Sequence, residues 1–255
     1  MIDIGSFIRK HRRLANGAGM LLTIALIFYV VSSPAIVGAS ASQRILPVYS
    51  VERTDKTVAI SFDAGWGNED TQQLLDILAA HGVRATFFVV GDWADKYPDS
   101  VKAIAQSGCE VMNHSSTHAH FASLTTDQIL ADIRACNGKV AALTGVEPSL
   151  FRCPYGEYDD HVISAVNSLG MTAIQWDVDS LDWKGISAQE ITDRVLRGVK
   201  DGSIILFHNA AEHTPEALPG ILDELQRRGY SVVPVSEILL SGETYLDNTG
   251  RQWAK

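Results

Sequence analysis

The sequence has few cysteines and no cysteine motif. Cys109, Cys136 and Cys153 are its only three, and no C-x-x-C pair occurs. An odd number of widely spaced thiols gives no sign of a disulfide framework or of a thiolate zinc site. At most one disulfide can form, and the sequence does not indicate which two thiols would form it.

The sequence also lacks internal repeats, low-complexity tracts and basic clusters outside its amino-terminal segment. Its 255 residues carry a formal net charge of -9. Residues 1–41 hold four bases and one acid, so residues 42–255 carry -12. Nucleic-acid binding requires clustered Lys and Arg that neutralise phosphates. We therefore expect no nucleic-acid partner, whereas a neutral or cationic ligand suits this charge.

The longest strongly apolar run, Met20–Val31, is only 12 residues long and follows four bases. This pattern is typical of a signal peptide, and Ala39-Ser40-Ala41 resembles a cleavage site. Counting on to Ala39 gives 20 residues, enough for one apolar helix that stays as a membrane anchor. Both interpretations place the remainder outside the cytoplasm. We expect residues 1–41 to be a signal peptide or anchor, the chain's membrane contact if uncleaved, and residues 42–54 to be a linker.

Strand-like and helix-like segments alternate from about residue 55 to residue 240. The predicted strands are Thr57–Phe62, Ala85–Val90, Glu110–Asn113, Leu150–Arg152, Met171–Trp176, Ser203–Phe207 and Ser231–Pro234. The predicted helices are Glu69–His81, Ser100–Gln106, Thr126–Thr144, Asp159–Leu169, Ser187–Val199 and Pro215–Arg228. Such alternation favours an α/β domain with parallel strands and helical crossovers, either a barrel or an open sheet. The polar tail, residues 241–255, is expected to be loose.

Chemically capable side chains recur where the predicted strands end. They are Asp63, His114, Arg152, Asp177, Asp179 and His208. Parallel α/β folds place their active sites at the carboxyl ends of the strands. We therefore expect these side chains to converge at one rim of the fold.

His114 and His118 form an H-x-x-x-H pair. On a helical turn, residues four apart face the same way, so the two imidazoles could share a metal ion. The alternative is a pair of ordinary polar loop histidines. Their position directly after a strand, among the other residues of the rim, favours a metal site.

Asp63 and His208 suggest a base and an acid. A carboxylate that faces a polarised water can take its proton, and an imidazole on the opposite side can protonate a leaving amine. The alternatives are a helix cap for Asp63 and a hydrogen-bonded histidine at the edge of the core for His208. A carboxylate beside His208, from Asp179 or Asp182, would raise the pKa of its imidazole.

Five ordered motifs between about residues 55 and 240 resemble those of the NodB-like polysaccharide deacetylases, carbohydrate esterase family four. They are SFDAGWGN (Ser61–Asn68), NHSSTH (Asn113–His118), RCPYG (Arg152–Gly156), WDVDSLDW (Trp176–Trp183) and ILFH (Ile205–His208). The FDAGWG form and the exported segment are similar to sporulation-type members. The resemblance implies a distorted (β/α)7 barrel that hydrolyses N-acetyl groups of an amino-sugar polymer such as peptidoglycan or a chitin-like glycan. We infer no protein partner from the sequence.

The resemblance also implies roles for individual residues. Catalytic roles fall to Asp63 as the base, His208 as the acid, Arg152 as the residue that orients the base, and Asp179 as the residue that tunes the acid. Metal binding falls to His114 and His118, with Zn2+ or Co2+ expected as the cofactor. Substrate contacts fall to Tyr155 through its backbone N–H, Trp183 in the groove wall and Leu206 in the pocket for the acetyl methyl group.

The chain departs from the family pattern at Ala64, where a second aspartate usually supplies the third metal ligand. Asn68, Glu69, Asp70, a second water or Asp63 itself could replace it. A glycan-binding relative with little or no activity is therefore the alternative function. A glycoside hydrolase is disfavoured, because Asp63 and Asp179 as its acid pair would leave two histidines and an arginine without a role.

Overall fold

The computed structural model describes Tyr29 and residues 44–255. The predicted signal peptide or anchor, residues 1–41, therefore lies outside the described residues apart from Tyr29. Within the part that is described, no helix has both the length and the apolar character needed to cross a membrane. Residues 45–255 form one compact unit.

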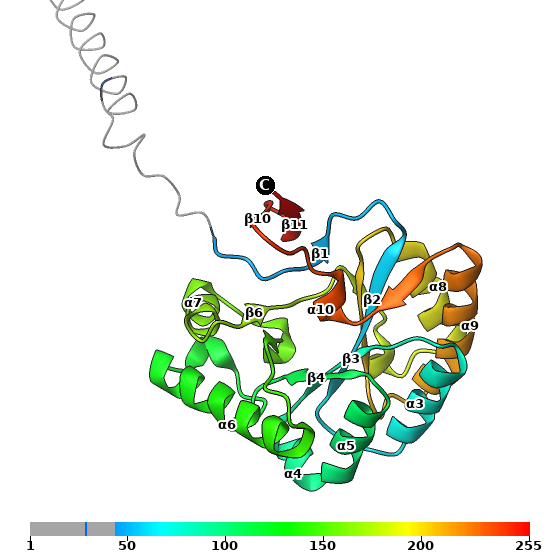
Figure 1. Ribbon diagram of the computed structural model, residues 1–255, viewed down its shortest axis with the longest axis horizontal. Coiled ribbons are helices and arrows are strands. Elements are labelled where there is room, and N and C mark those ends of the chain that lie inside the picture. The colour runs from blue at the N-terminus through cyan, green and yellow to red at the C-terminus, as the bar shows by residue number, and fades with distance from the viewer. Residues whose placement is uncertain (1–28, 30–43) are drawn as a thin grey trace, which may run out of the picture. The chain divides into compact units, whose positions relative to one another are not determined.

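The unit is built on a parallel sheet in the order β6-β5-β4-β3-β2-β8-β7, and β9 also pairs with β2 (Figure 1). The strands are β2 (Thr57–Ala64), β3 (Thr86–Val89), β4 (Glu110–Asn113), β5 (Leu150–Phe151), β6 (Thr172–Ala173), β7 (Val178–Asp179), β8 (Ile204–His208) and β9 (Ser231–Val233). All eight residues of β2 are buried, as a central strand covered on both faces requires. The predicted α/β class with parallel strands is confirmed.

Helices surround this sheet, and each packs on the next in the order α8, α9, α3, α5, α6 and α7 (Figure 1). Their bounds are α3 (Thr71–Ala80), α4 (Gly91–Lys96), α5 (Pro98–Gln106), α6 (Thr126–Thr144), α7 (Asp160–Ser168), α8 (Ala188–Gly198), α9 (Thr214–Arg227) and α10 (Val235–Ile238). Between sheet and helices, the Phe62 ring stacks on Phe87 and Phe207 of the neighbouring strands. The hydrophobic core thus fixes β2, β3 and β8 relative to one another.

Local sequence signals explain where two helices begin. The side chains of Thr125 and Ser187 each accept a hydrogen bond from a backbone N–H in the first turn. In return, the side chains of Gln128 and Glu190 accept the backbone N–H of Thr125 and of Ser187. These are capping boxes, which satisfy backbone donors that a helix start otherwise leaves free. Gly145 ends α6 in the left-handed conformation that glycine favours.

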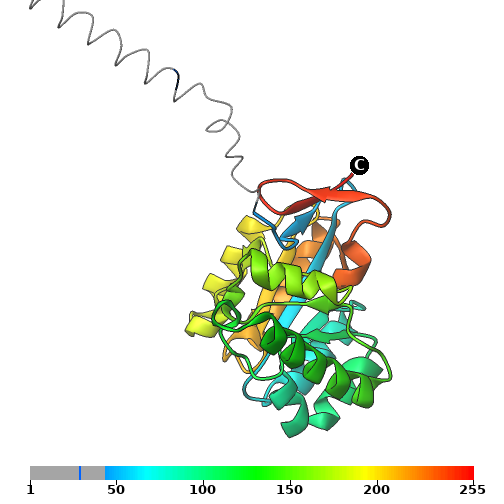
Figure 2. The ribbon, with the colours of Figure 1, turned by 90° about the vertical axis from the view of Figure 1, so that its left-hand side faces the viewer.

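Two expectations for the ends of the domain were wrong. The segment predicted as a linker contains β1 (Ser50–Val51), and the tail predicted to be loose contains β10 (Thr244–Leu246) and β11 (Arg251–Ala254). These strands form a second sheet in the order β1-β11-β10, with the hairpin beside β1 in both ribbon views (Figures 1 and 2). The tail is polar, yet β11 pairs with β10 and with β1, about 200 residues earlier, and this pairing satisfies backbone hydrogen-bonding groups of the tail. Arg251 adds a 2.8 Å contact to Glu52.

The predicted strand Met171–Trp176 is also shorter than expected. Only Thr172–Ala173 pair with β5, whereas Ile174 bridges to Val48 and the Gln175 N–H donates to the Val48 carbonyl. The second half of the predicted strand thus pairs with the chain around Val48. β7 then begins separately at Val178 and pairs with β8.

Candidate active site

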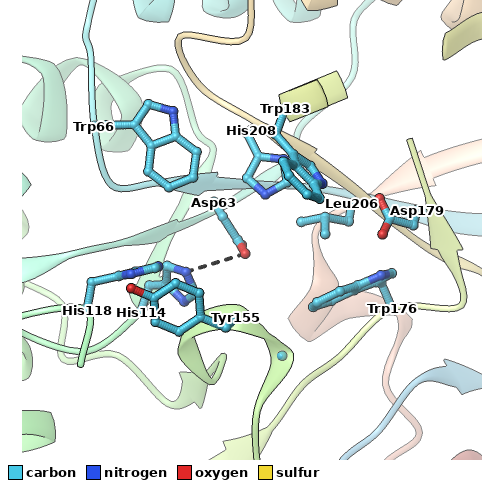
Figure 3. A pocket seen from close by; sticks show the side chains of 11 residues that line it. Asp63, Trp66, His114, His118, Tyr155, Trp176, Asp179, Trp183, Leu206 and His208 are labelled. Carbon is cyan, nitrogen blue, oxygen red and sulfur yellow. Dashed lines mark ion pairs between the residues drawn. The ribbon is translucent and has the colours of Figure 1, made fainter. Parts of the chain in front are cut away.

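A cavity of about 410 Å³ opens at the carboxyl ends of the strands, as the sequence predicts (Figure 3). Its lining residues are Asp63, Trp66, His114, His118, Tyr155, Gly156, Trp176, Asp179, Trp183, Leu206 and His208. Eight of the nine residues proposed from the sequence are in this lining, and the ninth, Arg152, contacts Asp63 from behind. The cavity has ionisable groups on its inner wall and aromatic rings at its mouth.

Asp63 is held by a buried arginine. Arg152 is fully buried, and its Nη1 donates to Asp63 Oδ1 over 2.8 Å. Its guanidinium lies 4.1 Å from the centroid of the Phe88 ring, and its Nη2 donates to the Gln175 carbonyl. Burial alone would raise the pKa of Asp63, but its charge interactions and the hydrogen bond from Arg152 outweigh burial and lower the pKa. Asp63 is therefore a fixed carboxylate with Oδ2 directed to the cavity side.

His114 and His118 approach each other, but not on a helix. Their ring centroids are 5.0 Å apart, and the chain between them is a loop in which Ser115 and His118 have φ of 73° and 56°. The Ser115 hydroxyl accepts the His118 N–H over 2.8 Å. The expected helical turn was wrong, because this loop folds back on itself and brings the rings together by left-handed residues instead.

The two imidazoles are neutral donors of lone pairs. Burial, first among the causes, lowers the pKa of His114 and lowers that of His118 to about 4. His114 Nδ1 lies 2.8 Å from the Arg152 carbonyl and must donate to it, which leaves the lone pair on Nε2. His114 Nε2 lies 3.4 Å from Asp63 Oδ2. Two electron-rich atoms thus face each other beside a second neutral imidazole, an arrangement that fits a divalent cation.

The other candidate ligands, Asn68, Glu69 and Asp70, do not line the cavity. Glu69 accepts the Asn68 N–H, Asp70 accepts the Ala210 N–H, and neither carboxylate lines the cavity. Ala64 is fully buried in the hydrophobic core. Among the described residues, no three His, Cys, Asp or Glu side chains are already arranged as a metal site. His114 and His118 are therefore the ligands that this cavity offers a cation, with the Asp63 carboxylate beside them.

The carboxylate behind His208 is Asp182 and not Asp179, which corrects the expectation from the sequence. Asp182 Oδ1 lies 2.7 Å from His208 Nδ1, and Oδ2 accepts the His208 N–H and the Thr214 hydroxyl. Asp179 lines the cavity but uses Oδ1 to accept the Leu181 N–H. Burial alone would lower the pKa of His208, yet the hydrogen bond and charge of Asp182 outweigh it and raise the pKa.

Three exposed aromatic side chains surround the mouth of the cavity. Trp66, Tyr155 and Trp183 are 45%, 61% and 54% exposed, large values for rings of this size, and flat apolar faces of this kind suit sugar rings. Leu206, only 2% exposed, supplies an apolar surface inside. The predicted contacts Tyr155, Trp183 and Leu206 therefore all lie at the cavity.

Trp66 and Trp176 also line the cavity, and sequence reasoning missed both. The Trp66 indole stacks on the His208 ring at 5.6 Å and meets the His118 ring edge-on at 6.2 Å. Its loop is held by Trp93 Nε1, which donates to the Gly67 carbonyl over 2.7 Å. A large aromatic residue between two glycines, directly after a strand, was the available signal.

The chain is similar to several known deacetylases. The polysaccharide deacetylase family model matches residues 50–174. The peptidoglycan-N-acetylglucosamine deacetylase PgdA of Listeria monocytogenes is 33% identical over 230 residues, which cover 86% of this chain and 48% of the relative. The chain thus spans about half the length of that relative. The peptidoglycan-N-acetylmuramic acid deacetylase PdaA of Bacillus subtilis is 30% identical over 75% of this chain and 74% of its own.

A solved structure adds a different point. BA3943 of Bacillus anthracis, described as a CE4 family pseudoenzyme, is 33% identical and superposes with a TM-score of 0.73, covering 76% of this chain and 68% of its own. A mutant of the same protein is described as having restored enzymatic activity. This similarity supports the expected distorted (β/α)7 barrel. Because fold, sequence and the five motifs agree, this chain belongs to the polysaccharide deacetylase family of hydrolases.

Proposed function

We propose that this protein removes N-acetyl groups from the amino sugars of peptidoglycan outside the cytoplasm, with Asp63 as the base and His208 as the acid. Peptidoglycan is the substrate in the names of both enzymes compared above. The observation that carries the proposal is the pairing of β2 with β8, in which Asp63 and His208 are direct neighbours. Their side chains therefore enter the same cavity beside each other.

The reaction needs a proton removed from water and a proton delivered to nitrogen. Asp63, held by Arg152, is oriented to take the proton of the attacking water. The water oxygen bonds to the carbonyl carbon of the acetyl group, and the electron pair of the C=O double bond moves to the acetyl oxygen, which becomes the oxyanion. This oxyanion fits the Tyr155 side of the cavity, where a donor to such an oxygen typically contributes about 3–4 kcal/mol. His208, kept protonated by Asp182, gives its proton to the amide nitrogen, so that the C–N bond breaks and the amine and acetate leave.

His114 and His118 are the residues that would hold a divalent cation, and Asp63 Oδ2, which lies 3.4 Å from His114 Nε2, stays available as the base. Bound there, the cation supplies Lewis acidity toward the acetyl carbonyl and the water. The chain itself contributes neutral imidazoles at physiological pH, because burial keeps both rings unprotonated. Zn2+ and Co2+ suit imidazole ligands.

Acetate release from N-acetylglucosamine oligomers and from peptidoglycan tests the proposal. We expect release to be lost with a chelator, to return with Zn2+ or Co2+, and to fall at least tenfold in His118→Ala. His161→Ala, a histidine outside the cavity, serves as the matched control and should retain the rate. Equal rates for wild type and His118→Ala would remove the metal role, and no release with any divalent cation would reject the hydrolase.

A second candidate function is glycan binding with little or no turnover. Ala64 favours it, because the usual third metal ligand is absent, and so does the similarity to a protein described as a pseudoenzyme. The aromatic mouth of the cavity would still bind sugars in such a protein. Saccharide binding without acetate release, and with substoichiometric metal after purification, would be its signature.

Ala64→Asp distinguishes the two candidates. Position 64 is fully buried, so an unpaired carboxylate there is destabilising, whereas one that reaches a cation is stabilising. We expect a lower Tm than wild type in chelator, a larger rise in Tm on addition of Zn2+ and faster acetate release. Ala64→Asn is the matched control without the charge. If Zn2+ raises the Tm of the Asp variant no more than that of the Asn variant, position 64 lies out of reach of the metal site.

A further inference from the structure

A second cleft adjoins the active-site cavity on the far side of Asp179. It is lined by Asp177, Val178, Asp179, Arg194, Arg197 and Gly198, and it shares Asp179 with the cavity. Arg194 and Arg197 are three residues apart on α8 and therefore lie on the same face of the helix. The two clefts therefore meet at Asp179.

The two arginines are held in place but keep their charge available. Arg194 Nε donates to the Asp179 carbonyl over 2.8 Å, and Arg197 Nε donates to the Asp193 carbonyl over 3.0 Å. Both side chains are exposed, and within residues 44–255 neither forms an ion pair. The Nη groups of both arginines are not used in a hydrogen bond or an ion pair among these residues, and both line one cleft, so they can bind a carboxylate there.

The acidic residues of this cleft already have partners. Asp177 accepts the Ile204 N–H and the Ser203 hydroxyl and lies 3.6 Å from Lys200. Asp179 accepts the Leu181 N–H. Neither carboxylate is bound to Arg194 or Arg197. In a chain whose residues 42–255 carry -12, two adjacent arginines without carboxylate partners point to an external anion.

We propose that Arg194 and Arg197 form a subsite for a carboxylate carried by the glycan, so that the enzyme prefers chains with acidic sugars over neutral chains. This rests on the proposed function, because it names the class of glycan that the same site takes. N-acetylmuramic acid, which bears a carboxyl group on an ether substituent, has the required chemistry. A neutral chitin-like chain has nothing to offer these two side chains.

The test compares matched glycan chains. The first chain is an N-acetylglucosamine oligomer, and the second alternates N-acetylglucosamine with N-acetylmuramic acid. The third is the second chain with its carboxyl groups converted to methyl amides, and the fourth is the alternating chain with peptide stems attached. For each chain we would measure Kd by calorimetry and KM by acetate release. Wild type should bind the acidic chain about tenfold more tightly than the amide, a preference that weakens with added salt because the arginines are exposed.

The doubly substituted variant Arg194→Gln/Arg197→Gln should lose this preference, so that the ratio of Kd values for acidic and amidated chains approaches one. Arg134→Gln is the matched control and should keep the wild-type ratio. Arg134 is an exposed arginine on α6 that also forms no ion pair among the described residues. A preference confined to the fourth chain would assign the carboxylate to the peptide and not to the sugar, which would overturn the muramic-acid assignment.

An unchanged ratio in the doubly substituted variant would overturn the subsite itself. Because calorimetry requires no turnover, this outcome is separate from the failure of the proposed function. If no chain releases acetate but the arginines still set the ratio of Kd values, the hydrolase is rejected and the subsite stands.

Discussion

Asp63→Asn is expected to lower kcat by about 10²–10⁴-fold, the range for a positioned general base, and to destabilise the fold as well. The amide cannot take a proton from water. It also leaves Arg152, which is fully buried, without its carboxylate. Removing one partner of a buried ion pair typically costs about 3–5 kcal/mol, which urea denaturation can measure.

The matched control is Asp92→Asn. Asp92 forms an exposed ion pair with Lys139 at 3.4 Å, and such pairs contribute about 0–1 kcal/mol. Its kcat should equal that of wild type. If Asp63→Asn is as stable as Asp92→Asn, the ion pair with Arg152 does not hold the fold together. If it also retains its rate, another group is the base.

Asp182→Asn is expected to move the alkaline limb of the rate profile to lower pH and to lower kcat by about 10²–10⁴-fold. His208 acts as an acid only while protonated, so the rate falls as pH rises through its pKa. The hydrogen bond and charge of Asp182 raise that pKa against the effect of burial. An amide at position 182 removes the charge, the pKa of His208 falls, and deprotonation begins at lower pH. Acetate release measured as kcat/KM against pH reports this shift.

Asp179→Asn is the control that decides between Asp182, which contacts His208 in the structure, and Asp179, which the sequence motif suggested. Asp179 contributes a weaker raising effect on the pKa of His208 through its charge alone, with no hydrogen bond to the ring. The alkaline limb of the rate profile should therefore move less in Asp179→Asn than in Asp182→Asn. A larger shift in Asp179→Asn would return the tuning role to Asp179, as the sequence motif suggested.

Much of the domain was predictable because its signals are local. The buried run Thr57–Ala64, the capping boxes at Thr125 and Ser187, and Gly145 at the end of α6 are each encoded within a few residues. The tail was not predictable in this way. β11 lies between β10 and β1, and β1 is about 200 residues earlier in the chain, so the pairing that stabilises β11 leaves no periodic signal in its own few polar residues.

The site was predictable in its members more than in its contacts. Eight proposed residues line the cavity because the carboxyl ends of parallel strands meet at one rim. The partner of His208 was mistaken because Leu181 adopts a left-handed conformation with φ of 55°, which a leucine rarely does. That turn directs Asp182 toward His208 and leaves Asp179 to accept the Leu181 N–H.

The sequence by itself therefore determined the fold class, the family and the set of ionisable side chains, because strand and helix periodicity and motif order are properties of the chain. Only the tertiary structure decided that Asp182 contacts His208, that Glu69 and Asp70 do not line the cavity, and that the Trp66 ring stacks on His208. Such contacts depend on loop conformation and on residues far apart in the chain, and no local pattern records either.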